Sequence, residues 1–230
     1  MKTILISLIS LLGGSLYAQS IQSTESEKLQ PFSVDLTFAS KFVYRGGQLV
    51  TNAIHPSLEY ANERIYAGYW GGYPTKNRAT EDTYHIFYAG ALQPVTKSAL
   101  VDFGAMQYVM SDSPDATEVY AGITKRASRF NTVMPGAYAY YNFESKALTL
   151  QGNADYGLKF RRVDWPVNLN ATLGGVVADT TRDYFFYGAG ATVPYSYQRS
   201  IVSVGVHYAS SSLRNTKRNM VFFTVGVLLH

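Results

Sequence analysis

The sequence predicts an all-β fold: a single antiparallel up-and-down transmembrane β-barrel of about 12 strands, with 10 or 14 also compatible. Apolar and polar residues alternate with a period of two through most of the chain, which is typical of strands with one apolar and one polar face. The connections between these runs alternate between compact turns and longer loops, and aromatic residues gather near the ends of the runs. This combination favours a barrel whose two ends face different compartments.

The composition excludes several other classes of protein. The 230 residues are 47% hydrophobic and 16% charged, and they include no cysteine. A disordered chain would carry more charge, a disulfide-rich secreted domain would need cysteine, and a multi-pass helical membrane protein would be more hydrophobic. The net charge of +4 is small and its basic residues do not cluster, so we expect no nucleic-acid partner.

The first residues have the pattern of an export signal. A charged start, Met1-Lys2-Thr3, precedes an apolar stretch from Ile4 to Leu12 and then small residues up to Ala18, as in a secretory signal peptide. The alternative is a membrane anchor, but an apolar stretch of about ten residues is too short to span the bilayer as a helix. We therefore expect a signal peptide at 1–18, a flexible periplasmic lead-in at 19–31 and the barrel at 32–230.

Turn-forming residues divide the barrel region into successive runs of alternating apolar and polar residues. In the first run, Ser33 to Phe38, the even positions are apolar and the odd positions polar, and we expect this parity to continue to Tyr44. Around 98–126 the parity is blurred, because Gln107 falls on the same side as Val101 and Phe103, which predicts a bulge or a shifted run there. The predicted strands are 32–45, 52–61, 64–72, 82–93, 98–110, 116–126, 132–143, 147–160, 165–178, 184–194, 199–210 and 218–230.

Alternation alone does not distinguish a membrane barrel from a soluble lipocalin-type barrel or a sandwich, in which the apolar face points inward. The polar faces are poor in lysine and glutamate and rich in threonine, asparagine, serine and glycine, unlike a solvated surface. The sequence also holds 19 tyrosines, a residue suited to the interface between lipid and water. We therefore expect lipid-facing apolar side chains, with an interfacial aromatic belt of Tyr44, Tyr60, Tyr66, Trp70, Tyr140, Tyr187 and Tyr208.

The same parity selects candidates for the inside of the barrel. A charge that faced lipid at mid-bilayer would cost about 2–4 kcal/mol, so charged residues near the middle of a strand are expected to face the lumen. Such charges either pair across a narrow lumen and stiffen the barrel, or form a constriction that sets ion selectivity. The lumen and constriction candidates are Asp35, Lys41, Arg45, His55, Glu59, Asp155, Lys159 and His207.

The segment Arg45-Gly46-Gly47 comes where the first predicted strand ends. We interpret it as a turn, because glycine readily adopts positive φ, with the arginine reaching a lipid phosphate or a carboxylate of a neighbouring loop. The alternative is a contact that folds this turn over the mouth of the barrel and narrows it.

One part of the chain resembles a known family. The run Phe38-Ala39-Ser40-Lys41-Phe42-Val43-Tyr44-Arg45-Gly46-Gly47, followed by His55 to Tyr60 and then Tyr66 to Gly71, resembles the opening of the TorF family of outer-membrane porins. The resemblance is specific over Phe38 to Gly71 and only architectural beyond it. It implies an outer-membrane barrel with a pore role and supplies no catalytic residues. The chain departs from the common barrel pattern in ending on His230 rather than on an aromatic residue.

These observations predict a narrow, porin-like channel for passive diffusion of small ions or solutes, exported to the outer membrane of a Gram-negative-type cell. Expected partners are outer-membrane lipids and lipopolysaccharide, the small solutes or ions, and the outer-membrane assembly machinery, with no cofactor and no metal. One alternative is a closed structural or adhesion barrel with partner-binding surface loops. A lipid-modifying enzyme is less favoured, because the sequence has no Gly-x-Ser-x-Gly and no His-Glu-x-x-His motif.

Overall fold

The computed structural model describes residues 31–76, 82–125, 133–159, 165–179, 182–213 and 219–229. All of the regular structure in these ranges is β-sheet, and the twelve strands confirm the predicted fold class. None of the described residues forms a helix long and apolar enough to cross a membrane. The strands are β1 (Phe32–Tyr44), β2 (Gly47–Ala61), β3 (Ile65–Pro74), β4 (Tyr84–Pro94), β5 (Ala99–Met110), β6 (Ala116–Lys125), β7 (Val133–Asn142), β8 (Ala147–Leu158), β9 (Val167–Ala178), β10 (Tyr184–Tyr197), β11 (Ser200–Ser211) and β12 (Asn219–Leu229).

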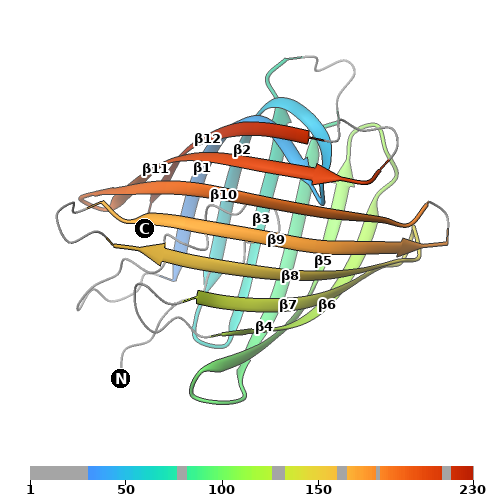
Figure 1. The fold of residues 1–230 in the computed structure, drawn as a ribbon, viewed down its shortest axis with the longest axis horizontal. Coiled ribbons are helices and arrows are strands. Elements are labelled where there is room, and N and C mark those ends of the chain that lie inside the picture. The colour runs from blue at the N-terminus through green and yellow to red at the C-terminus, as the bar shows by residue number, and fades with distance from the viewer. Residues whose placement is uncertain are drawn as a thin grey trace.

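The twelve strands form one closed barrel. Each strand pairs antiparallel with its neighbours in the sequence, and β1 closes the ring by pairing with β12, where Asp35 lies opposite Leu228. Figure 1 shows β8 to β12 as the front wall, in yellow to red, with β2 to β5 crossing behind it. Closure leaves no exposed sheet edge that could pair with another chain.

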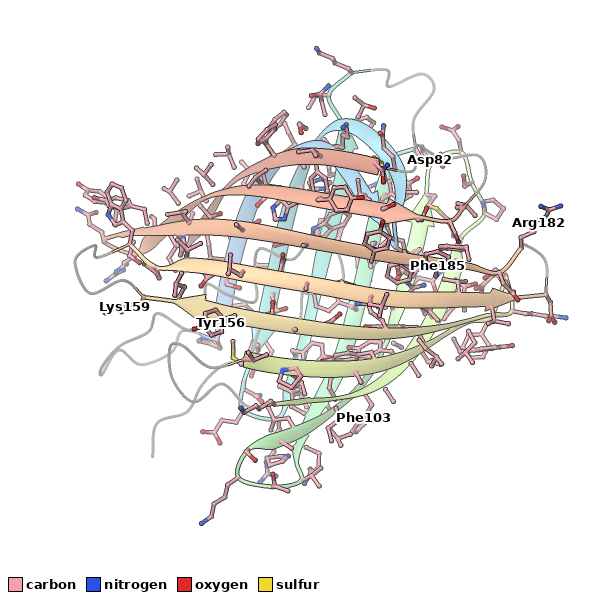
Figure 2. All side chains as sticks on the ribbon, in the orientation of Figure 1. Asp82, Phe103, Tyr156, Lys159, Arg182 and Phe185 are labelled. Atoms are coloured by element: carbon pink, nitrogen blue, oxygen red, sulfur yellow. The ribbon has the colours of Figure 1, made fainter. Side chains whose placement is uncertain are left out.

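The barrel has two distinct ends. We call the end where β1 begins at Phe32 and β12 ends at Leu229 the termini side, and the opposite end, where β1 turns into β2, the loop side. Lys159 and Arg182 mark these two ends in Figure 2. The expected signal peptide (1–18) and lead-in (19–31) lie outside the described residues except for Pro31, whose carbonyl accepts a hydrogen bond from the Ala61 amide (2.8 Å).

Side chains alternate between the two faces of the wall. Large apolar residues lie outside, for example Leu173 (64% exposed), Phe223 (59%) and Val204 (55%), whereas the acidic residues of the strands are buried inside. The outward-pointing Phe103 and Phe185 are labelled in Figure 2. The apolar-out, polar-in arrangement inverts the pattern of a soluble barrel.

The predicted parity fails in one place and holds in another. Along β1, Ala39 and Phe42 both face inward, three residues apart instead of two, and the β1–β2 pairing shifts register between Phe42 and Val43. In β2, Asn52 takes a positive φ of 53° at the same level.

The bulge predicted around 98–126 is wrong, because β5 pairs continuously with β4 and β6. The alternation is blurred in the sequence because apolar Leu100, Met106 and Tyr108 are buried on the inner face of this strand.

Candidate functional site in the barrel lumen

Tyrosines from β3 to β7 cover one half of the inner surface, which we call the tyrosine wall. Four of these rings lie over glycines of an adjacent strand, where a Cβ atom would overlap with them. The missing side chain of each glycine therefore leaves the space that the tyrosine side chain occupies against the wall. The ring and glycine pairs are Tyr88 over Gly68, Tyr66 over Gly90, Tyr120 over Gly104 and Tyr138 over Gly122.

Hydrogen bonds connect the tyrosine wall to buried carboxylates. The Tyr66 hydroxyl donates to Asp102 Oδ1 (2.7 Å) and is also hydrogen-bonded to Tyr120. The Tyr88 hydroxyl donates to Glu59 Oε2 (2.9 Å). Each phenol thus buries a large apolar ring while its hydroxyl satisfies an acidic group.

The other half of the inner surface, formed by β8 to β12 and β1, carries small polar side chains, and we call it the polar wall. Thr149, Asn168 and Thr192 are buried there, but several neighbours keep intermediate exposure. On the tyrosine wall, by contrast, most of the large side chains are buried. The accessible part of the lumen therefore follows the polar wall. Its half-exposed residues are Thr37, Asn153, Asn170, Thr172 and Thr224.

The turn between β1 and β2 folds into the lumen at the loop side. Arg45 lies between the two strands and donates from Nη1 and Nη2 to the two carboxylate oxygens of Glu118 on β6 (2.8 and 2.7 Å). Its guanidinium also lies over the rings of Tyr44 (4.7 Å) and Tyr140 (4.8 Å). Because β6 lies almost opposite β1 in the ring of strands, this ion pair spans the lumen.

Backbone conformation and close packing hold this turn in place. Arg45 (φ 46°) and Gly46 (φ 74°) both have positive φ, as in the type I′ turns of two-residue hairpins. A Cβ atom at Gly46 would lie 2.7 Å from Phe186 Cβ and 2.7 Å from the Ser210 carbonyl oxygen. The turn thus contacts β10 and β11 as well as β6, so it is the inward-folded contact considered above as the alternative, and its carboxylate partner belongs to a strand rather than to a loop.

The structure places most of the predicted lumen candidates inside. Two of them lie elsewhere: Lys159 follows the end of β8 at the termini side and is exposed, and Lys41 lies at the irregular step of β1, where its ammonium donates to the Val221 carbonyl (2.7 Å). Lys159 leaves the lumen because β8 ends one residue earlier. The candidates that are buried inside are Asp35, Arg45, His55, Glu59, Asp155 and His207.

The predicted aromatic belt divides between the two faces. Tyr66 (3% exposed), Trp70 (4%) and Tyr140 (1%) are buried in the lumen, and the Tyr44 hydroxyl is hydrogen-bonded to that of Tyr108 (2.9 Å). These four are corrected to lumen residues, because they follow the inward parity of their strands and, for Tyr44, because the step at Phe42 reverses the parity. The remaining belt residues lie on the outer face, where Phe32 contacts Tyr60 and Tyr187 contacts Tyr208.

The histidines form packing contacts rather than a catalytic arrangement. The His55 imidazole stacks on Trp70 (4.6 Å between centroids) and its Nδ1 lies 3.2 Å from the Gly71 carbonyl oxygen. His207 Nε2 lies 3.0 Å from Thr224 Oγ1, and His85 contacts Tyr69 on the outer face. None of the three described histidines is hydrogen-bonded to a serine, and no three His, Asp or Glu residues of the described chain are close enough to hold a metal ion.

Two buried carboxylates, Asp102 on β5 and Glu118 on β6, are absent from the lumen residues predicted from the sequence. Both are acidic residues within predicted strands, so the cost of facing lipid could have identified them. The blurred parity of 98–126 hid them, because it left the inward side of this region undefined.

The fold is similar to that of solved outer-membrane barrels. The KdgM porin superposes with a TM-score of 0.61 at 12% identity, covering 86% of this chain and 98% of that chain. The NanC porin gives 0.56 at 11% identity (86% and 99% covered), and LpxR from Salmonella typhimurium gives 0.54 at 10% identity (86% and 99%). No family model matches the sequence, and no curated protein matches it either. At these identities the likeness concerns the fold.

We predict that Gly122→Ala destabilises the barrel, because the added Cβ would overlap with the Tyr138 ring. Overpacking of this kind costs about 1–3 kcal/mol, and the urea midpoint of the purified protein should fall accordingly. The matched control is Gly152→Ala, whose Cβ would meet nothing closer than 3.9 Å. Equal midpoints for the two variants would contradict the packing of tyrosine over glycine.

We predict that Glu118→Gln destabilises the barrel by about 3–5 kcal/mol, since it leaves the Arg45 guanidinium buried without a counter-charge. The exposed residue Asp179, after β9, provides a control, and Asp179→Asn should leave the free energy of unfolding unchanged. Adding Arg45→Asn to Glu118→Gln should recover part of the loss. A single Glu118→Gln variant as stable as the Asp179→Asn control would mean that the ion pair does not hold the turn.

Proposed function

We propose that the chain is exported to the outer membrane of a Gram-negative-type cell and forms a narrow channel for passive diffusion of small ions or solutes. The observation that carries the proposal is the combination of an apolar outer surface with a polar, partly accessible inner wall in a closed barrel of twelve strands. A barrel of 8 strands is filled by side chains, whereas 16 or more strands leave a wide aqueous channel, so 12 strands are intermediate. The similarity to the KdgM and NanC porins supports the same interpretation.

The proposed channel is narrow for two reasons. Large rings of the tyrosine wall cover one half of the inner surface, and the turn that carries Arg45 reaches across the loop side. Only small ions or solutes would therefore pass, along the polar wall. Outer-membrane lipids and lipopolysaccharide would surround the barrel, and assembly machinery would insert it. Tyr60, Tyr187 and Tyr208 would lie at the lipid interface.

We also propose that the chain is related to the TorF family and is not an enzyme. The residues that carry the resemblance, Phe38 to Gly71, include the Arg45 turn, which reaches across the loop side. Among the described residues, no histidine is hydrogen-bonded to a serine as a nucleophile and base pair would require, and the similarity to the KdgM and NanC porins supports a channel.

We predict that the protein fractionates with the outer membrane, migrates faster on SDS gels before boiling than after it, and gives discrete conductance steps in planar bilayers. An SDS-resistant barrel without conductance would contradict the channel and favour a closed structural or adhesion barrel. A periplasmic protein whose migration does not depend on heating would contradict the membrane assignment.

We predict that Val204→Arg impairs assembly into the membrane, because Val204 is 55% exposed near the middle of β11. An arginine facing lipid there would cost about 2–4 kcal/mol, but near the interface only about 0–1 kcal/mol. The control is Val95→Arg, at an exposed valine (59%) in the turn after β4. The amount of heat-modifiable barrel in the membrane fraction is the readout, and equal amounts for both variants would contradict a lipid-facing exterior.

A further inference from the structure

The inner wall carries an excess of negative charge. The acidic residues of the twelve strands all lie inside and are buried, whereas the only basic residues of these strands are Lys41 and Lys125. Lys125 is the last residue of β6 and donates to the Val133 carbonyl, and Lys41 is bound to the Val221 carbonyl. Arg45 neutralises Glu118 alone. The acidic residues are Asp35, Glu59, Asp102, Glu118 and Asp155.

These carboxylates are concentrated towards one end of the barrel. Asp35 and Asp102 each lie three residues after the start of their strands, and Glu59 and Asp155 lie within three residues of the ends of theirs, all on the termini side. Asp155 on β8 and Asp35 on β1 flank the polar wall on its two sides. No three His, Asp or Glu residues of the described ranges form a group that could hold a metal ion, so we treat these carboxylates as separate charges along the lumen.

A second observation comes from polar atoms that lack a partner. Asp35 and Asn168 are each only 3% exposed. Asp35 Oδ2 and the side-chain atoms Oδ1 and Nδ2 of Asn168 are buried and have no hydrogen-bond partner. Asp155 has no hydrogen-bonding or ionic partner among the described residues. Buried polar groups are nearly always satisfied, and a buried carboxylate needs a counter-charge. Inward-facing groups of this kind point to water and mobile cations in the lumen.

We propose that this lumen is selective for small cations, with Asp35 and Asp155 providing the charge that attracts them beside the polar wall. The inference rests on the proposed channel function and specifies its substrate class. One neighbouring structure is the KdgM porin in complex with disordered oligogalacturonate. An oligogalacturonate bears a carboxylate on each sugar, and the acidic inner wall described here would repel such a polyanion. Similarity in fold therefore does not imply that this chain binds oligogalacturonate.

The test is the reversal potential of the purified barrel in a planar bilayer under a KCl gradient. We expect potassium to be more permeant than chloride, and the permeability ratio to fall by about threefold for each carboxylate removed in Asp35→Asn and Asp155→Asn. The control is Asp179→Asn, the same change at an exposed residue after β9, and it should keep the wild-type ratio. SDS resistance before boiling verifies that each variant is folded.

A further variant covers the case in which removal of a buried carboxylate prevents folding. Thr172→Lys adds a positive charge at a half-exposed position of the polar wall and should lower the permeability ratio in the same direction. A channel that prefers chloride, or a ratio unchanged in these variants, would overturn cation selectivity and leave the channel function standing. A folded barrel that gives no conductance would overturn both.

Discussion

Closure of the sheet is the constraint on which the rest of the structure depends. In β1, the residues from Val34 to Ala39 pair on both sides, with β2 and β12, so the ring of described strands has no free edge to protect by other means. A closed ring gives every strand one inward and one outward side, and its limited lumen must be shared by all of the inward side chains. The crowded interior is a consequence of this geometry, and the alternation of apolar and polar residues decides which side chains lie there.

Crowding is resolved differently on the two halves of the ring. On the tyrosine wall, large rings lie over glycines of neighbouring strands, and two of their hydroxyls donate hydrogen bonds to Asp102 and Glu59. On the polar wall, small side chains leave part of the lumen accessible. The Arg45 turn narrows the loop side, and Asp35 and Asp155, which form no ion pair with a described residue, lie at the termini side. A solute would thus meet a steric constriction at one end and a negatively charged region at the other.

Periodicity in the sequence was sufficient to predict the fold, because a period of two reports directly on which residues share a face. Eleven strands begin and end within three residues of the predicted runs, whereas β2 begins five residues early, at Gly47. Buried Asp35, His55, Glu59, Asp155 and His207 follow the predicted parity. What periodicity could not predict was a local change of register, as at Phe42, or an aromatic residue that faces inward. A tyrosine has an apolar body and a polar tip, so it suits a lipid interface and a packed lumen equally well. Its place was decided by the glycine on the next strand, and that pairing depends on register, which a single sequence does not give.

The accessible part of the lumen follows the polar wall and not the tyrosine wall, and single-cysteine variants test this arrangement directly, because the chain has no cysteine. The variants are Thr172→Cys on the polar wall and Met106→Cys on the tyrosine wall, each treated with a cationic thiol reagent during conductance recording. We expect that modification of Thr172→Cys reduces the current and that Met106→Cys stays unmodified. Rapid modification of Met106→Cys with Thr172→Cys unreactive would contradict it.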